Sequence, residues 1–118
     1  MGYLQVVTTI DSPDEADRIG RELVQQRLVA CFQVLGPIRS TYRWQGAVEQ
    51  AEEWLCLAKT TTERYDELAG VLARLHPYDT PEIIATPIVG GHGDYLEWIA
   101  TETGQPDEGE PPQRLTGG

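Results

Sequence analysis

Two long strand-like segments flank Gln45-Gly46 near the middle of the chain, and they constrain the fold more than any other feature. In residues 30–44, alternate positions form one face of an extended strand, which Gly36-Pro37 must bend. Residues 48–60 return as a second strand, and a Gln-Gly pair suits a tight turn, although less strongly than Asn-Gly. Each arm has about 13–15 residues, whereas strands average about 5–6. We therefore predict an unusually long β-hairpin.

The segment before the hairpin predicts a strand followed by a helix. Residues 3–10 are rich in β-branched and aromatic side chains, which favour a strand. Ser12-Pro13 then supplies a capping hydroxyl and a proline at the first helical position, and Glu15 completes the start signal. Apolar residues at helical spacing continue this helix to about Leu28.

The segment after the hairpin predicts a helix, a strand and a short last helix. Thr61 or Thr62 is expected to cap the second helix, which Pro77 ends. Residues 82–88 favour a fourth strand, and Asp94 is expected to cap the last helix. The order βαββαβ plus a C-terminal helix predicts an α+β, ferredoxin-like fold with an antiparallel sheet.

The composition divides the chain and limits its partners. Residues 1–103 are expected to form one ferredoxin-like domain, and residues 104–118 an acidic, Pro/Gly-rich tail with little apolar content. The net charge of -10 disfavours nucleic acid and anionic membrane surfaces as partners. No stretch approaches the ~20 apolar residues of a membrane span, and two cysteines are too few for a disulfide scaffold. We expect a cytoplasmic protein with reduced thiols.

The predicted hairpin is too long to pair fully within a small sheet, so its distal part should project. Tyr42, Trp44 and Trp54 would then leave large aromatic surfaces in water, together with unpaired strand edges. A neighbouring subunit can cover both, which predicts an oligomer. The alternative is a hairpin that folds back onto its own domain at Gly36-Pro37.

Five sequence blocks resemble the successive motifs of the CutA family of divalent-cation tolerance proteins. They are residues 27–31 (RLVAC), 40–46 (STYRWQG), 53–60 (EWLCLAKT), 76–82 (HPYDTPE) and 95–99 (YLEWI). The resemblance covers about residues 3–100. It implies a ferredoxin-like subunit that forms a homotrimer through its long hairpins, with an architecture similar to the PII signalling proteins. It also implies a role in tolerance to divalent metal ions and an association with copper.

The resemblance places Cys31 and His76 at positions associated with copper, and both are ligand types that copper accepts. Two ligands are too few for a closed site, so Glu82, water or a neighbouring subunit would have to contribute. Some members carry a second histidine where this chain has Leu75. The alternative is structural: Cys31 as a small buried hydrophobe and His76 as a favourable helix-end residue.

Trp44, Lys59, Tyr78 and Glu82 suggest a second kind of site. Together they would offer an aromatic wall, a fixed positive charge, a hydroxyl and a carboxylate, which suits a pocket between subunits for a small anion or metabolite. The alternative is a buried Lys59–Glu82 ion pair that fixes the register of the trimer.

The sequence carries no recognisable catalytic motif. It has no GxSxG, no HExxH and no phosphate-binding loop, and the segment after the first strand is acidic where an acylphosphatase-like enzyme needs an anion loop. We therefore expect no enzymatic activity. The two functional hypotheses are a metal-binding tolerance protein and a PII-like structural or signalling trimer that binds a small anionic ligand at its subunit interface.

Overall fold

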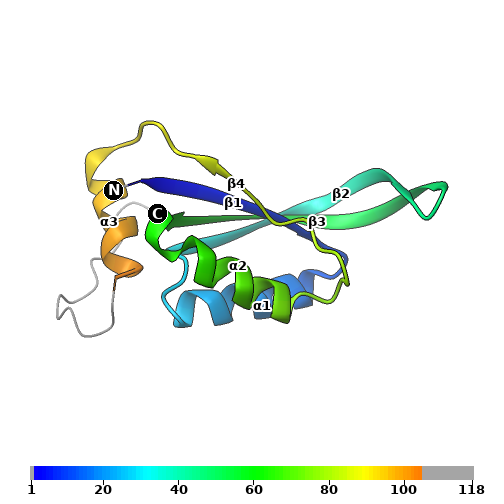
Figure 1. Cartoon of the computed structure of the whole chain (residues 1–118), viewed down its shortest axis with the longest axis horizontal. Helices are drawn as coiled ribbons and strands as arrows, with labels where there is room; N and C mark the ends of the chain where they lie inside the picture. Colours follow the sequence, from blue (N-terminus) through cyan, green and yellow to red (C-terminus); the bar gives the residue numbers. More distant parts are fainter. Residues whose placement is uncertain (1, 105–118) are drawn as a thin grey trace.

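A computed structural model describes residues 2–104 of the chain, and its centre is one four-stranded antiparallel sheet. The strand order is β2-β3-β1-β4 (Figure 1). The strands are β1 (Tyr3–Ile10), β2 (Cys31–Trp44), β3 (Ala47–Thr61) and β4 (Ile84–Pro87). The predicted α+β, ferredoxin-like order and the long hairpin are confirmed. The predicted tail lies outside the described residues, except for residue 104.

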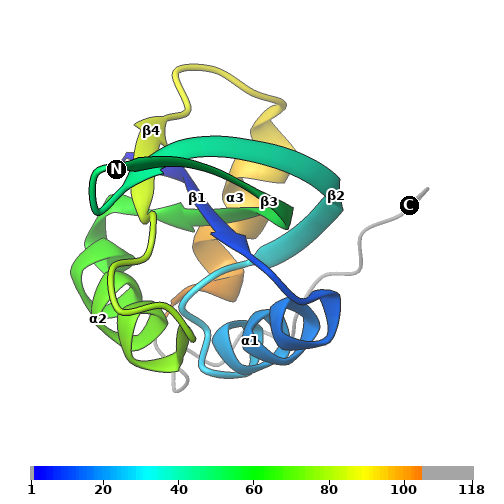
Figure 2. The same ribbon diagram turned by 90° about the vertical axis from the view of Figure 1, so that its right-hand side faces the viewer.

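Two helices cover one face of the sheet, and a third lies at one end. The helices are α1 (Pro13–Gln25), the 3-10 turn η1 (Thr62–Arg64), α2 (Tyr65–Leu75) and α3 (Gly93–Glu102). Figures 1 and 2 show α1 and α2 side by side below the sheet, whereas α3 lies at the end away from the hairpin tip. None of the helices in this described part of the chain has the length and hydropathy that a membrane span requires.

The helix starts show where local sequence signals are sufficient. Ser12 caps α1 as predicted, because its Oγ accepts a hydrogen bond from the backbone N–H of Glu15 at 3.2 Å. The other two predicted caps are wrong. The chain passes from β3 into η1 before α2 begins, with no side-chain cap from Thr61 on η1, while α3 begins at Gly93 with Asp94 inside its first turn.

Arg27 fixes the C-terminal end of α3 against the connection between α1 and β2. Its Nε donates to the carbonyl of Gly104 at 3.0 Å, and its Nη2 donates to the carbonyl of Thr101 at 2.7 Å. A cationic side chain is favourable at the negative end of a helix, where carbonyls lack partners within the helix. This contact holds α3 in place over the start of β2.

The hairpin projects beyond the rest of the sheet. β1 pairs with β3 only as far as Ile10 opposite Trp54, so residues 38–53 pair only with each other (Figure 1). Gln45 and Gly46 both have positive φ angles, 49° and 84°, as a tight turn with the twist of the flanking strands requires. A register shift between Leu35 and Ile38 marks the predicted bend at Gly36-Pro37. The alternative of a hairpin folded back onto its own domain is therefore wrong.

The register divides the side chains of the sheet between two faces, because directly opposite residues in an antiparallel pair share a face. Val6, Phe32 and Ala58 lie on the face covered by α1 and α2, where Val6 and Ala58 belong to the buried core. The other face, which we call the open face, carries a second apolar set: Val7, Leu35, Leu55, Leu57 and Ile84. Leu35 is 60% exposed and Ile84 51% exposed, so the open face is only partly covered within one chain.

Candidate functional site

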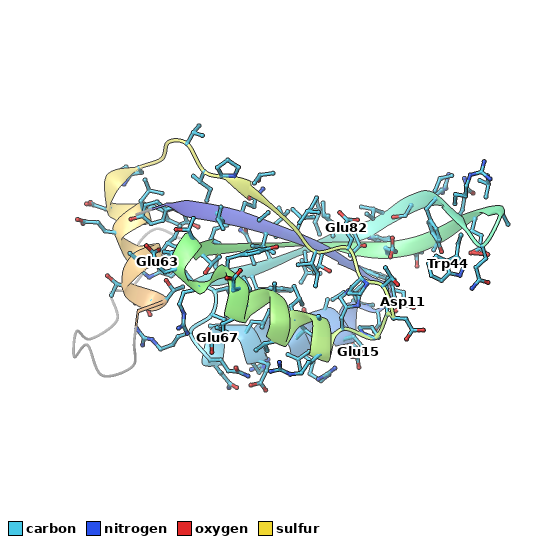
Figure 3. All side chains as sticks on the ribbon, viewed as in Figure 1. Asp11, Glu15, Trp44, Glu63, Glu67 and Glu82 are labelled. Atoms are coloured by element: carbon cyan, nitrogen blue, oxygen red, sulfur yellow. The ribbon has the colours of Figure 1, made fainter. Side chains whose placement is uncertain are left out.

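A cleft of about 600 Å³ lies at the base of the projecting hairpin. It lies between the end of β1, the projecting part of the hairpin as far as Trp44 near the turn, and the loop that follows α2. Its lining residues are Thr9, Ser40, Thr41, Tyr42, Trp44, Glu49, Glu53, Tyr78, Thr80 and Glu82. Figure 3 shows Trp44 on the projecting hairpin, with Glu82 and Asp11 closer to the helices. The volume is in the range of pockets that hold small molecules.

The structure brings together Trp44, Tyr78 and Glu82 of the predicted pocket and places Lys59 elsewhere. Lys59 lies opposite Gln5 and Cys31, five residues beyond Trp54 along β3, and its Nζ donates to Oε1 of Gln33. Within the described residues of one chain, Lys59 and Glu82 form no ion pair. The cleft of a single chain therefore lacks the positive charge on which the prediction of an anionic ligand depended.

Glu53 and Tyr78 form the polar centre of the cleft, and Glu53 is not among the site residues predicted from the sequence. The Tyr78 hydroxyl donates to Oε2 of Glu53 at 2.7 Å. Glu53 is only 7% exposed, although it lies on a hairpin strand. Burial and this bond to a carboxylate raise the pKa of Tyr78 far above its usual range, so Tyr78 remains a neutral donor.

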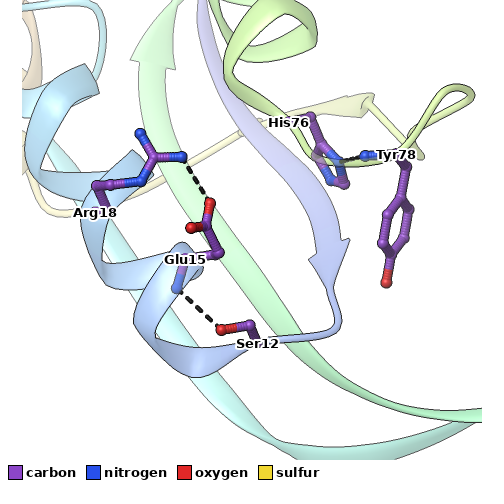
Figure 4. Close-up of polar contacts among 5 residues, drawn as sticks. All are labelled: Ser12, Glu15, Arg18, His76 and Tyr78. Carbon is purple, nitrogen blue, oxygen red and sulfur yellow. Dashed lines mark hydrogen bonds and ion pairs between the residues drawn. The ribbon is translucent and has the colours of Figure 1, made fainter.

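His76 is buried at the inner side of the cleft, where its ring forms hydrogen bonds with β1 and with the loop after α2. Its Nδ1 accepts a hydrogen bond from the backbone N–H of Tyr78 at 3.1 Å (Figure 4). Its Nε2 lies 3.0 Å from the carbonyl oxygen of Thr9 and 3.1 Å from Oγ1 of Thr8. Because a carbonyl can only accept, Nε2 carries the proton and the ring is neutral. Both ring nitrogens of His76 are therefore already engaged in hydrogen bonds within the chain.

Cys31 and His76 do not form a metal site within one chain. Cys31 begins β2 opposite Lys59 and has its Sγ 3.7 Å from the Tyr95 hydroxyl, whereas His76 contacts Thr8 and Thr9. Gln5 and Thr8, the corresponding positions on β1, are roughly 10 Å apart at about 3.3 Å per residue. No group of three or more His, Cys, Asp and Glu side chains among residues 2–104 is arranged to hold a metal ion. The predicted pair therefore does not fit copper in a single subunit.

The burial of His76 predicts a loss of stability in mild acid. Burial lowers its pKa below the ordinary value of 6.5, against smaller opposing effects of the Thr9 bond and of Asp11 and Glu53. The unfolded chain then binds a proton at higher pH than the folded chain, so the contribution is complete above about pH 6.5 and decreases as the pH falls toward the lowered value. Urea unfolding between pH 8 and pH 5, at fixed protein concentration, measures this dependence.

The control for this prediction is the exposed His92. His76→Gln should flatten the pH dependence of the free energy of unfolding in this range, because the titrating group is gone. His92→Gln should leave it unchanged. An identical decline in the wild type and in His76→Gln would contradict the assignment.

Comparison with known proteins connects this sequence and fold with one family. The family described as CutA1 divalent ion tolerance protein matches residues 4–102. The "Divalent-cation tolerance protein CutA" of Thermus thermophilus is 42% identical over 99 residues, which cover 84% of this chain and 96% of the relative. The human "Protein CutA" is 34% identical over 96 residues, 80% of this chain and 54% of that protein.

Solved structures show the same arrangement. The crystal structure of CutA from Xylella fastidiosa has a TM-score of 0.84 and 39% identity, covering 86% of this chain and 98% of its own. That of CutA1 from Oryza sativa has a TM-score of 0.86 and 32% identity, covering 89% and 96%. The similarity therefore extends over nearly all of the residues that form the sheet, the hairpin and the cleft.

Proposed function

Because the chain belongs to the CutA1 divalent ion tolerance family, we propose that it acts in divalent-cation tolerance as a non-catalytic homotrimer in the cytoplasm. The observation that carries the proposal is the family match over residues 4–102, joined to 42% identity with a relative named for divalent-cation tolerance. Divalent ions, copper among them, are the proposed partners. The resemblance to CutA proteins implies an assembly of three subunits.

The surface of the single chain supports assembly. β2 and β4 are the edge strands of the sheet, and an unpaired edge is a ready site for pairing with another chain. The apolar residues of the open face are left partly in water, as are Trp44 and Val48 on the hairpin. Contiguous exposed apolar surface of this kind is typical of an interface. A second copy of the chain carries the same edges and the same face.

The proposal does not depend on a copper site made by Cys31 and His76. Cys31 begins β2, whereas His76 follows α2 and has both of its ring nitrogens hydrogen-bonded. A thiolate alone cannot complete a coordination shell, since closed sites use about four ligands. The tolerance role is therefore assigned to the assembled protein and not to this pair of residues.

The non-catalytic part of the proposal is supported by the state of His76. This histidine is buried, and both its nitrogens are held by the backbone around the cleft, so it is not free to act as a general base. The nearby Tyr78 is a neutral hydroxyl bonded to Glu53 and not an activated nucleophile. These contacts are typical of a structural network.

Growth of a bacterial strain that lacks its own CutA protein tests the proposed role. Expression of this chain is expected to restore growth in toxic concentrations of copper(II), because the role belongs to the shared fold. The readout is the copper concentration that halves the growth rate. Failure to restore growth, with the protein shown to be folded and abundant in those cells, would count against the role in tolerance.

A further inference from the structure

The last helix, α3, is attached to the domain less firmly than the helices that cover the sheet. Among its ten residues only Ile99 is buried, whereas α2 buries Leu68, Val71 and Leu72. Figure 1 shows α3 at the end of the sheet, away from the layer that α1 and α2 form. Segments with little buried apolar surface open locally at a low cost in free energy. We therefore expect α3 to open more readily than α1 or α2.

The connection that leads into α3 is suited to act as a hinge. A Cβ added at Gly90 or at Gly93 would meet no atom of the described chain within 4 Å, so the backbone has open space there. Val89, just before these glycines, is 96% exposed. His92, the N-cap of α3, makes no side-chain hydrogen bond to the first turn. Glycine adopts a wide range of backbone angles, so rotation at this segment meets little resistance.

Arg27 is the main polar attachment at the other end of α3. Its Nε and Nη2 donate to the carbonyls of Gly104 and Thr101, at 3.0 Å and 2.7 Å. The backbone of Arg27 has a φ of 60°, in the left-handed region where glycine is usual after a helix. A residue at a strained backbone position is a reason to look for a role of its side chain. The role of this side chain is to hold α3.

The attached position of α3 also has a local cost. Oε2 of Glu102, the last residue of the helix, is buried and has no hydrogen-bond partner among residues 2–104. A buried polar atom without a partner is unfavourable, and a carboxylate at the C-terminal end of a helix opposes the helix dipole. Opening of α3 would return this oxygen to water. The contacts of Arg27 therefore hold the helix against a local penalty.

Attached α3 lies against the thiol of Cys31 at the start of β2. The Sγ of this partly buried cysteine is 3.7 Å from the Tyr95 hydroxyl of α3. Tyr95 stacks on Trp98 of the same helix, with ring centroids 5.6 Å apart, so both rings would move with the helix. We propose that α3 is a strap that opens as a unit while the sheet and the subunit contacts stay intact, and that its opening uncovers the Cys31 thiol. Such a strap would control access to the thiol whether or not the protein acts in metal tolerance.

Hydrogen exchange of the full-length protein tests the opening of the strap. Amides of α3 should exchange through an opening that costs less free energy than the opening of β1 and β3. Their rates should stay the same on dilution, because no subunit has to dissociate. Exchange that is measured by mass spectrometry at several protein concentrations gives both comparisons.

The two cysteines of the chain give a second readout. Dithiobis(nitrobenzoate) is a bulky reagent whose disulfide a thiolate attacks, forming a mixed disulfide and releasing one thionitrobenzoate. Cys56 is fully buried in the core, so it should react only after global unfolding. Cys31 should react at least about tenfold faster, through local opening of α3. Peptide mass spectrometry assigns the label to each cysteine.

Arg27→Gly removes the attachment and leaves a residue that suits the φ of this position. It should speed exchange of α3 and labelling of Cys31 at least about tenfold, because two hydrogen bonds from a charged donor are lost. The rate at Cys56 should not rise to match. Gln26→Gly is the matched control, because it changes the same connection at a side chain that bonds Glu22 of α1 and not α3. It should keep the Cys31 rate within about twofold of the wild type.

Glu102→Ala tests the strap in the opposite direction. It removes the unpartnered carboxylate oxygen and should slow both readouts at least about threefold, because the attached position loses a local penalty. Glu97→Ala makes the same substitution at an exposed position of α3, and its effect is that of helix propensity alone. Opening should therefore be slower in Glu102→Ala than in Glu97→Ala.

Any of three results would overturn the proposal. Equal opening free energies for the amides of α3 and of β1 would mean that the helix opens only with the whole domain. Labelling of Cys31 that rises on dilution but not in Arg27→Gly would mean that a neighbouring subunit covers the thiol. A Cys31 rate that is the same in the wild type and in Arg27→Gly at every concentration would mean that α3 does not control access to it.

Discussion

A Leu35→Asp variant is expected to lose the native assembly. Leu35 is 60% exposed in one chain and lies on the open face with Leu55, its partner on β3. If this face is buried between subunits, the new carboxylate enters an apolar interface without a partner, which costs several kcal/mol for each copy. Light scattering coupled to gel filtration should give about 39 kDa for the wild type, three times the 13.1 kDa chain, and a smaller or unfolded species for the variant.

The control is an equivalent substitution on the opposite side of the molecule. Val24→Asp places the same charge at a 42% exposed apolar residue of α1, the helix that covers the other face of the sheet. This variant should keep the wild-type mass. A wild-type protein that remains a 13.1 kDa monomer at low micromolar concentration would disprove assembly through the open face and the hairpin.

Most of the fold could be predicted from local sequence patterns. The strand from Tyr3, the cap at Ser12 and the turn at Gln45-Gly46 depend on residues close together in the chain, and the structure confirms all three. The predicted starts of the second and third helices were less accurate. A threonine or aspartate near a helix start can lie outside it, cap it or fall in its first turn, and the incoming direction of the chain decides which.

The candidate site could be predicted only in part, because it depends on register. Trp44, Tyr78 and Glu82 come together since the loop after α2 runs past the base of the hairpin. Lys59 looked equivalent in the sequence, but a position along β3 is fixed by its pairing with β1, which no local pattern reveals. Glu53 was missed for the same reason. The available signal was only a carboxylate beside Trp54 in a predicted strand.

The burial of α1 against the sheet leads to the largest expected change in stability. Leu23→Ala should lower the free energy of unfolding by about 2–5 kcal/mol, because it removes a fully buried side chain and leaves a cavity. Leu23 belongs to the core cluster with Ile19 and Val6, residues that join α1 to β1. Urea unfolding, followed by circular dichroism at a fixed protein concentration, measures the change.

Val24→Ala is the matched control one position further along the same helix. Val24 is 42% exposed, so its truncation removes little buried surface, and alanine is the better helix former of the two. Its free energy of unfolding should stay within about 0.5 kcal/mol of the wild type. Equal losses in the two variants would mean that burial against the sheet does not hold α1 in place. A loss confined to Leu23→Ala means that α1 is held by the apolar stripe that it buries against the sheet. The open face lies on the other side of the sheet and takes no part in this packing.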